Sequence, residues 1–120
     1  MRLPAAIVLV ALGATSALAD DGGAALMGVG ATPCTGYSEE YGRNPSGADP
    51  VFFSWAQGFM SGLNLTQKAL NKPMYDLAAM PMQEQLTRLR QLCAEKPLLP
   101  YAYAVQDLMK QFPEIPLRPN

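Results

Sequence analysis

The chain has 120 residues, enough for one small domain. Nine lysine and arginine residues against ten aspartate and glutamate residues give a net charge of −1, and there is no histidine. Nucleic acid is therefore not an expected partner, because phosphate binding needs a basic surface. Without histidine the chain lacks the usual general base and the commonest metal ligand, so we expect no enzyme activity, no cofactor and no metal site. A hydrophobic content of 49% excludes a disordered protein.

The N-terminal residues have the pattern of a secretion signal. Arg2 precedes an apolar run over residues 3–12, and residues 17–19 read Ala-Leu-Ala, a typical cleavage sequence. The run is shorter than the roughly 20 apolar residues that a membrane span needs. The sequence therefore predicts a signal peptide over residues 1–19, cleavage after Ala19, export to the periplasm and no membrane span. An uncleaved N-terminal anchor is the alternative.

Export changes the meaning of the two cysteines, Cys34 and Cys93. In an oxidising compartment, an even pair far apart in the sequence favours one structural disulfide. The wide spacing excludes a CxxC redox motif and a cysteine-based metal cluster. A reactive thiol is the alternative, but no histidine or local basic cluster is present to lower its pKa.

The first part of the exported chain contains one recognisable helix. Residues 20–33 are rich in glycine and alanine and show no period, which predicts a flexible lead-in. From Cys34 onward, Tyr37 and Tyr41 follow at i+3 and i+7, which predicts a short helix with these three residues on one side. The glycines and the proline of residues 42–49 then predict a turn region.

A second helix is predicted to begin at Asp49-Pro50, since aspartate caps free amides and proline suits the first helical position. Its apolar residues recur at helical spacing and form one bulky stripe. The stripe consists of Phe52, Trp55, Phe59 and Leu63.

Two glycines, Gly58 and Gly62, stand four residues apart on this helix. Each costs about 1 kcal/mol relative to alanine, which suggests that another backbone packs closely against them. In a membrane the same spacing would indicate helix dimerisation. In an exported domain we expect close packing within the molecule.

Two further helices follow a connection over residues 66–80. One is opened by Pro81 and has an apolar stripe of Met82, Leu86, Leu89 and Cys93. The other is started by Pro100 and directs inward Tyr101, Ala104, Val105, Leu108 and Phe112. Three prolines in residues 113–120 predict an extended tail. The sequence therefore predicts an all-α fold: a small bundle of about four helices over residues 34–112, with one disulfide that ties the first helix to the third.

The aromatic and methionine content offers a binding surface instead of chemistry. Phe52 and Phe53 are adjacent and do not easily face one core. Phe53 and Met60 are therefore candidates for a partly exposed, adaptable apolar surface, along with Met74 and Met80. The alternative is that they fill the core or lie under loops.

The order of these motifs resembles the small periplasmic acid-stress chaperones of the HdeA/HdeB type. The resemblance rests on Cys34-x-x-Tyr37, on the helix reading Trp55-Ala-Gln-Gly-Phe-Met-Ser-Gly62, and on Leu89-Arg-Gln-Leu-Cys93. It implies a helical protein with one disulfide, dimeric at neutral pH, that loosens in acid and binds unfolding proteins. The implied hidden client surface consists of Phe52, Trp55, Phe59 and Leu63, and the Cys34–Cys93 bond would limit unfolding.

The chain is also similar to the Tai-type immunity proteins. These are exported, helical, disulfide-bonded dimers, and the resemblance implies a partner that is a cognate secreted cell-wall amidase. An acid response has a physical basis independent of either family. Protonation of the ten carboxylates below about pH 4 makes the chain strongly positive, and self-repulsion then opposes a compact or dimeric state. The expected partner is a protein, either an unfolding client or a cognate toxin.

Overall fold

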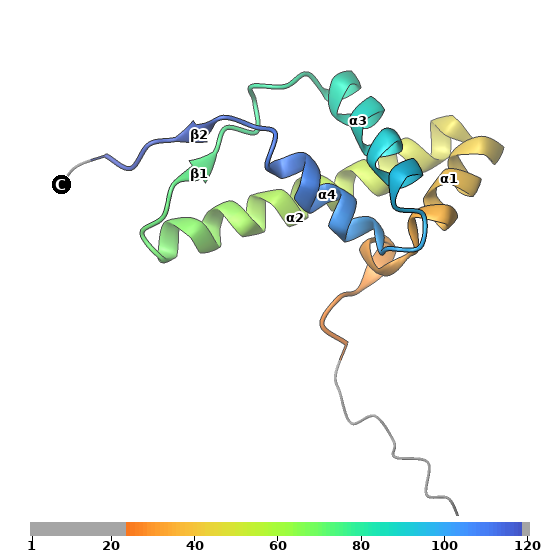
Figure 1. Ribbon diagram of the computed structural model, residues 1–120, viewed down its shortest axis with the longest axis horizontal. Helices are drawn as coiled ribbons and strands as arrows, with labels where there is room; N and C mark the ends of the chain where they lie inside the picture. Colours follow the sequence, from red (N-terminus) through yellow and green to blue (C-terminus); the bar gives the residue numbers. More distant parts are fainter. Residues whose placement is uncertain (1–23, 119–120) are drawn as a thin grey trace, which may run out of the picture.

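The structure, a computed structural model, describes residues 24–118 (Figure 1). The predicted signal peptide and its cleavage site lie outside the described residues. The elements in chain order are η1 (Gly28–Ala31), α1 (Cys34–Arg43), α2 (Pro45–Ala69), β1 (Met74–Tyr75), α3 (Met82–Glu95), α4 (Tyr101–Met109) and β2 (Glu114–Ile115). The predicted all-α class, with about four helices and one disulfide, is confirmed.

The long helix α2 runs the length of the molecule, with α1 near its first turns and α4 across its middle (Figure 1). Helix α3 packs on α1 and α4. The backbones of α2 and α3 approach each other less closely than those of the other packed helices, and the two helices meet through their side chains in the common core. This arrangement leaves a space along the line where α2 faces α3.

An aromatic cluster ties α1, α2 and α4 together. The ring centroids of Tyr37 and Phe52 are 4.6 Å apart, and the Tyr101 ring lies 5.1 Å from Tyr37 and 5.0 Å from Phe52. The hydroxyl of Tyr101 donates a hydrogen bond to the Phe52 carbonyl at 3.1 Å, so its buried polar group is satisfied. The inward face predicted for the fourth helix is confirmed, because all five of its predicted residues are buried.

The predicted Cys34–Cys93 disulfide is present and joins the start of α1 to the end of α3. Both cysteines are buried. Beside the bond, the backbone N–H of Cys34 donates to the Leu99 carbonyl at 2.8 Å, and that of Thr35 donates to the Pro97 carbonyl at 2.9 Å. The α3–α4 loop is therefore fastened to the same end of α1.

The predicted start of the second helix at Asp49-Pro50 is wrong. Helix α2 begins at Pro45, and the side chain of Asn44 caps it by accepting from the Gly47 backbone N–H at 3.2 Å. Pro50 lies inside the helix and leaves the Ser46 carbonyl without its usual i+4 donor. Ser46 is exposed, so water can satisfy that carbonyl and the cost is small.

The close packing predicted at Gly58 and Gly62 is also wrong. Both residues are exposed, and a Cβ built on either would meet no atom within 4 Å among the described residues. They face away from the bundle, because the apolar stripe that turns α2 toward the core lies on its other side.

Short elements extend the folded unit at both ends of the predicted helical domain. In the predicted lead-in, η1 packs on α2 and α4, Pro33 forms a β-bridge with Pro100, and Tyr101 donates its backbone N–H to the Thr32 carbonyl at 2.8 Å. In the predicted tail, β2 pairs antiparallel with β1. The sequence reasoning missed these contacts because both partners are too short to show a period.

Candidate functional site

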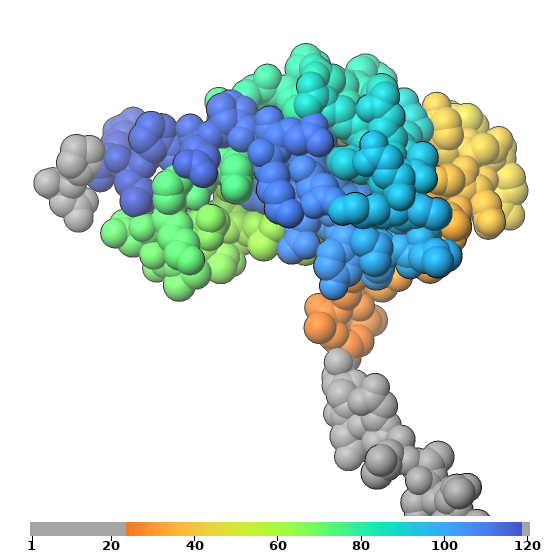
Figure 2. Space-filling model, in the orientation of Figure 1, coloured from red at the N-terminus to blue at the C-terminus, as the bar shows by residue number. Residues whose placement is uncertain are grey.

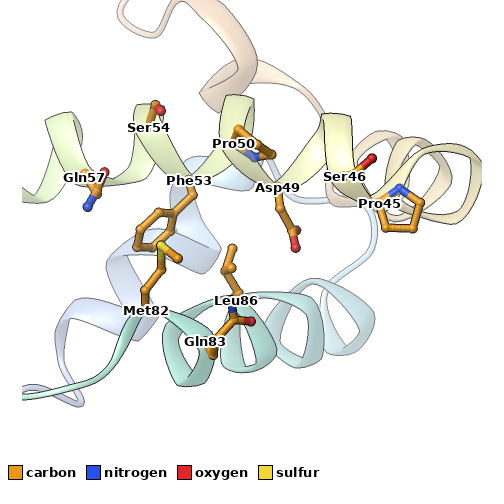
Figure 3. A pocket seen from close by; sticks show the side chains of 10 residues that line it. All are labelled: Pro45, Ser46, Asp49, Pro50, Phe53, Ser54, Gln57, Met82, Gln83 and Leu86. Atoms are coloured by element: carbon orange, nitrogen blue, oxygen red, sulfur yellow. The ribbon is translucent and has the colours of Figure 1, made fainter.

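A groove of about 580 Å³ lies between α2 and α3 (Figure 3). Ten residues line it: Pro45, Ser46, Asp49, Pro50, Phe53, Ser54, Gln57, Met82, Gln83 and Leu86. The first seven belong to α2 and the last three to the first turns of α3. The groove therefore lies along the line where the backbones of the two helices stand apart.

The base of the groove is apolar. In Figure 3 the side chains of Phe53 from α2 and Leu86 from α3 point into the space between the helices. These residues are only 5% and 4% exposed, so their positions are set by the core beneath them. Met82 stands beside Phe53 but is 52% exposed, because it is the first residue of its helix and has neighbours on one side only. A bound group would therefore meet a fixed apolar base and one adaptable apolar side chain.

One ion pair crosses from α2 to α3 at the edge of the groove. The carboxylate of Asp49 accepts from Arg90 Nη1 at 3.3 and 3.4 Å and from the Tyr37 hydroxyl at 3.1 Å. Burial, together with the neighbouring Asp49 charge, raises the pKa of Tyr37 to about 12, so this hydroxyl stays protonated and donates. The Arg90 guanidinium also lies 4.5 Å from the Tyr41 ring centroid, in cation–π geometry.

The groove thus carries little net charge. Asp49 is the one charged side chain among the described residues that line it, and Arg90 balances that charge. The remaining polar lining residues are uncharged serines and glutamines, such as Gln57 and Gln83, which both donate and accept hydrogen bonds. The chemistry on offer is apolar contact with a few directional hydrogen bonds.

The six residues predicted as a protein-binding surface do not form one surface. Phe52, Phe53 and Met60 are buried, and only Phe53 of these lines the groove. Trp55, Phe59 and Leu63 are half-buried against the core. Trp55 and Phe59 stack on each other with centroids 4.9 Å apart and planes 16° apart. Phe53, Met60 and Met80 belong to the core, which is the alternative that the sequence left open, and Met74 is half-buried. The expectation that Phe52 and Phe53 do not face one core is wrong, because both lie in the same buried cluster.

The sequence reasoning missed most of the groove. The sequence predicts Asp49 as a helix cap, but Asp49 lies inside α2 and its side chain reaches α3. The sequence also predicts Met82 in a buried stripe, but Met82 is exposed because the first residue of a helix often lacks covering neighbours. The serines and glutamines of the lining form no recognisable sequence motif. They can be recognised as lining residues only once the positions of α2 and α3 are known.

Neither a metal site nor a membrane-spanning helix is seen within residues 24–118. No three His, Cys, Asp or Glu side chains in this range come together in a way that could hold a metal ion. No helix in it is long and apolar enough to cross a membrane. In comparisons with protein-family models, curated proteins and solved structures, nothing matches this chain.

Proposed function

We propose that this chain is a non-enzymatic periplasmic protein that binds one specific protein partner in the α2–α3 groove at neutral pH. The observation that carries the proposal is a groove with an apolar base and several polar lining residues, whose two helices are fixed by covalent and ionic links. The disulfide fastens α3 to α1, and the Asp49–Arg90 ion pair joins α3 to α2. A site held in this way loses little freedom on binding, which favours affinity for a partner of fitting shape.

The groove favours an apolar side chain of the partner flanked by backbone polar groups. Phe53, Leu86 and Met82 supply the apolar contact, while Gln57 and Gln83 supply the hydrogen bonds. Its volume of about 580 Å³ is comparable to pockets of roughly 300–1,000 Å³ that hold small molecules, so it has room for an apolar side chain of a partner. The resemblance to Tai-type immunity proteins makes a secreted cell-wall amidase the first partner to test.

Titration calorimetry of the exported chain against candidate amidases at about pH 7 tests this function. We expect Met82→Glu to weaken binding about tenfold or more, because a buried interface residue often contributes over 1 kcal/mol and a charge there is desolvated. Leu65→Glu is the matched control, since Leu65 is an exposed apolar residue of α2 that does not line the groove. Equal affinity in both variants would contradict groove binding, and an amidase that binds neither variant nor the parent chain would remove that partner class.

A second candidate function is acid-dependent binding of unfolding proteins. The observation that favours it is the partial exposure of the Trp55–Phe59–Leu63 stripe in a domain that also contains ion pairs that acid would break. Four carboxylates make such pairs, and Asp107 pairs with both Lys96 and Lys110. Hydrogen bonds from the two lysines hold the pKa of Asp107 below its usual range. Their stabilising effect is present above the pKa of the unfolded chain and is lost as pH falls through the folded value.

Aggregation of an acid-labile client at about pH 3 and about pH 7, with and without the chain, separates the two functions. Suppression at the lower pH only, together with loosening or dissociation seen by size-exclusion chromatography, would favour the acid-dependent function. A compact species at both pH values with no suppression would contradict it and leave binding in the groove as the function to pursue.

A further inference from the structure

Residues 27–31, which consist of Met27 and η1 and are called the strap below, lie across the aromatic side chain of Trp55. Figure 2 shows the orange N-terminal residues at the lower edge of the molecule, next to the blue residues of α4, on which η1 packs. The strap joins α1 through Thr32 and Pro33. It therefore covers part of α2 from outside the helical bundle.

The contact between the strap and Trp55 is shaped for glycine. A Cβ added to Gly30 would overlap the six-membered ring of Trp55, so a residue with a side chain cannot occupy that position without moving the strap. Gly28 has φ of +72°, a conformation that also favours glycine. One directional bond completes the contact: Trp55 Nε1–H donates to the Met27 carbonyl at 3.1 Å. The indole thus holds a single glycine-containing 3₁₀ turn by its face and by its N–H.

The strap is held by apolar packing and by the Trp55 hydrogen bond. Val29 packs against the edge of the core and Gly30 is buried on the Trp55 ring. Residues 24–33 carry no charge, so the part of the strap region that the structure describes makes no ion pair. The next attachments are the Thr32 carbonyl that accepts from Tyr101 and the Cys34 disulfide. Lifting residues 27–31 away from Trp55 would remove Val29 from the edge of the core but leave those two attachments in place.

The surface beneath the strap is a stacked aromatic platform. Trp55 and Phe59 lie face to face, and behind them the Trp55 centroid is 6.1 Å from the Tyr101 ring. A shallow hollow of about 230 Å³ continues from it, lined by Ala25, Leu26, Phe59, Ala102, Tyr103 and Gln106. This platform flanks the buried face of α2 on the side away from the groove, because Trp55 and Phe59 project differently from Phe53.

We propose that the Trp55–Phe59 platform is a binding site for an uncharged peptide segment that forms a single glycine-containing turn, occupied in the resting chain by its own residues 27–31. The chemistry of the ligand follows from the present occupant. A backbone without a side chain at one position fits the ring, a carbonyl accepts from the indole N–H, and small or apolar residues fill the adjoining hollow. Binding in the groove is not required for this site. If clients bind as the second candidate function states, this platform is where their segments would lie.

The test uses a chain that lacks residues 20–31 and a synthetic peptide with the sequence of residues 24–32. Trp55 is the only tryptophan, so its fluorescence reports on the platform alone. We expect the deletion to shift Trp55 emission to longer wavelength and the peptide to reverse that shift saturably. A peptide carrying the Gly30→Val substitution should bind about tenfold or more weakly, since its side chain overlaps the ring. A folded, disulfide-bonded chain that binds neither peptide, or both equally, would overturn the proposal.

A full-length variant decides the question if the shortened chain does not fold. Gly30→Val should displace the strap, shift Trp55 emission to longer wavelength, and let the peptide of residues 24–32 bind about tenfold or more tightly than it binds the parent chain. Gly58→Ala is the matched control, because a Cβ added to that glycine would meet no atom within 4 Å among the described residues, and it should behave as the parent chain does. Unchanged emission and peptide affinity in Gly30→Val would overturn the proposal. Neither measurement involves acid, a client protein or an amidase, so both can fail separately from the proposed functions.

Discussion

Removal of the Cys34–Cys93 cross-link should cost this domain a large part of its stability. The bond closes a loop with a sequence separation of 59 residues that contains all of α2 and most of α3. For a loop of that length, the loss of freedom in the unfolded chain corresponds to about 4 kcal/mol. A domain of this size has a total free energy of unfolding of roughly 5–15 kcal/mol, so the loss amounts to a quarter or more of it.

The assay is urea denaturation at about pH 7, followed by circular dichroism, on three species. The parent chain with its disulfide is compared with the same chain after reduction and with the Cys34→Ala/Cys93→Ala variant. Reduction removes the cross-link but keeps both sulfur atoms, whereas the double substitution also leaves small cavities at two buried positions. We expect the free energy of unfolding to decrease from the parent chain to the reduced chain and then to the double variant. A loss of less than about 1 kcal/mol on reduction would refute the reasoning that the loop dominates.

Three further perturbations have defined expectations. At high pH the domain should lose stability as pH rises from about 10 through about 12 and beyond, measured by thermal melts. Burial raises the pKa of both Tyr37 and Tyr101 in the folded chain, so folding favours their neutral forms and this stabilisation is lost as the two hydroxyls ionise. Asp107→Asn should cost less than about 1 kcal/mol at neutral pH, since its ion pairs are largely exposed, and should reduce the loss of stability on acidification, seen in melts between about pH 7 and pH 2. Asn64→Ala should cost about 1–2 kcal/mol in urea denaturation, because the Asn64 amide bonds both the N–H and the carbonyl of Tyr75 and so joins β1 to α2; an unchanged midpoint would mean that water replaces both bonds.

The parts of the fold that could be predicted are those with a local pattern. Tyr101, Val105 and Leu108 follow helical spacing, and all three are fully buried in α4. Pro81 and Pro100 stand directly before the helices they were expected to begin. The same local reasoning failed at Asp49-Pro50, where a proline inside a longer helix imitates a helix start because its cost at an exposed turn is small.

The candidate sites depended on contacts that no local pattern contains. Asp49 and Arg90 are separated by 41 positions in the sequence, and their ion pair exists because α1 and the disulfide hold α3 facing α2. Gly30 and Trp55 come together because the N-terminal residues cross back over α2 before α1 begins. Gly58 and Gly62 share their spacing with glycines at close helix contacts, yet they face open space.

The existence of the four helices, most of their apolar faces and the disulfide between two of them follow from the amino-acid sequence, because helical periodicity and proline placement are properties of neighbouring residues. What covers each apolar face depends on how the helices pack. That packing leaves a groove over Phe53 where α2 and α3 stand apart, and it places a glycine-containing strap over Trp55. Whether an apolar face is buried, open or covered depends on the distances between elements that are remote in the chain, and those distances are set by the packing of the whole domain.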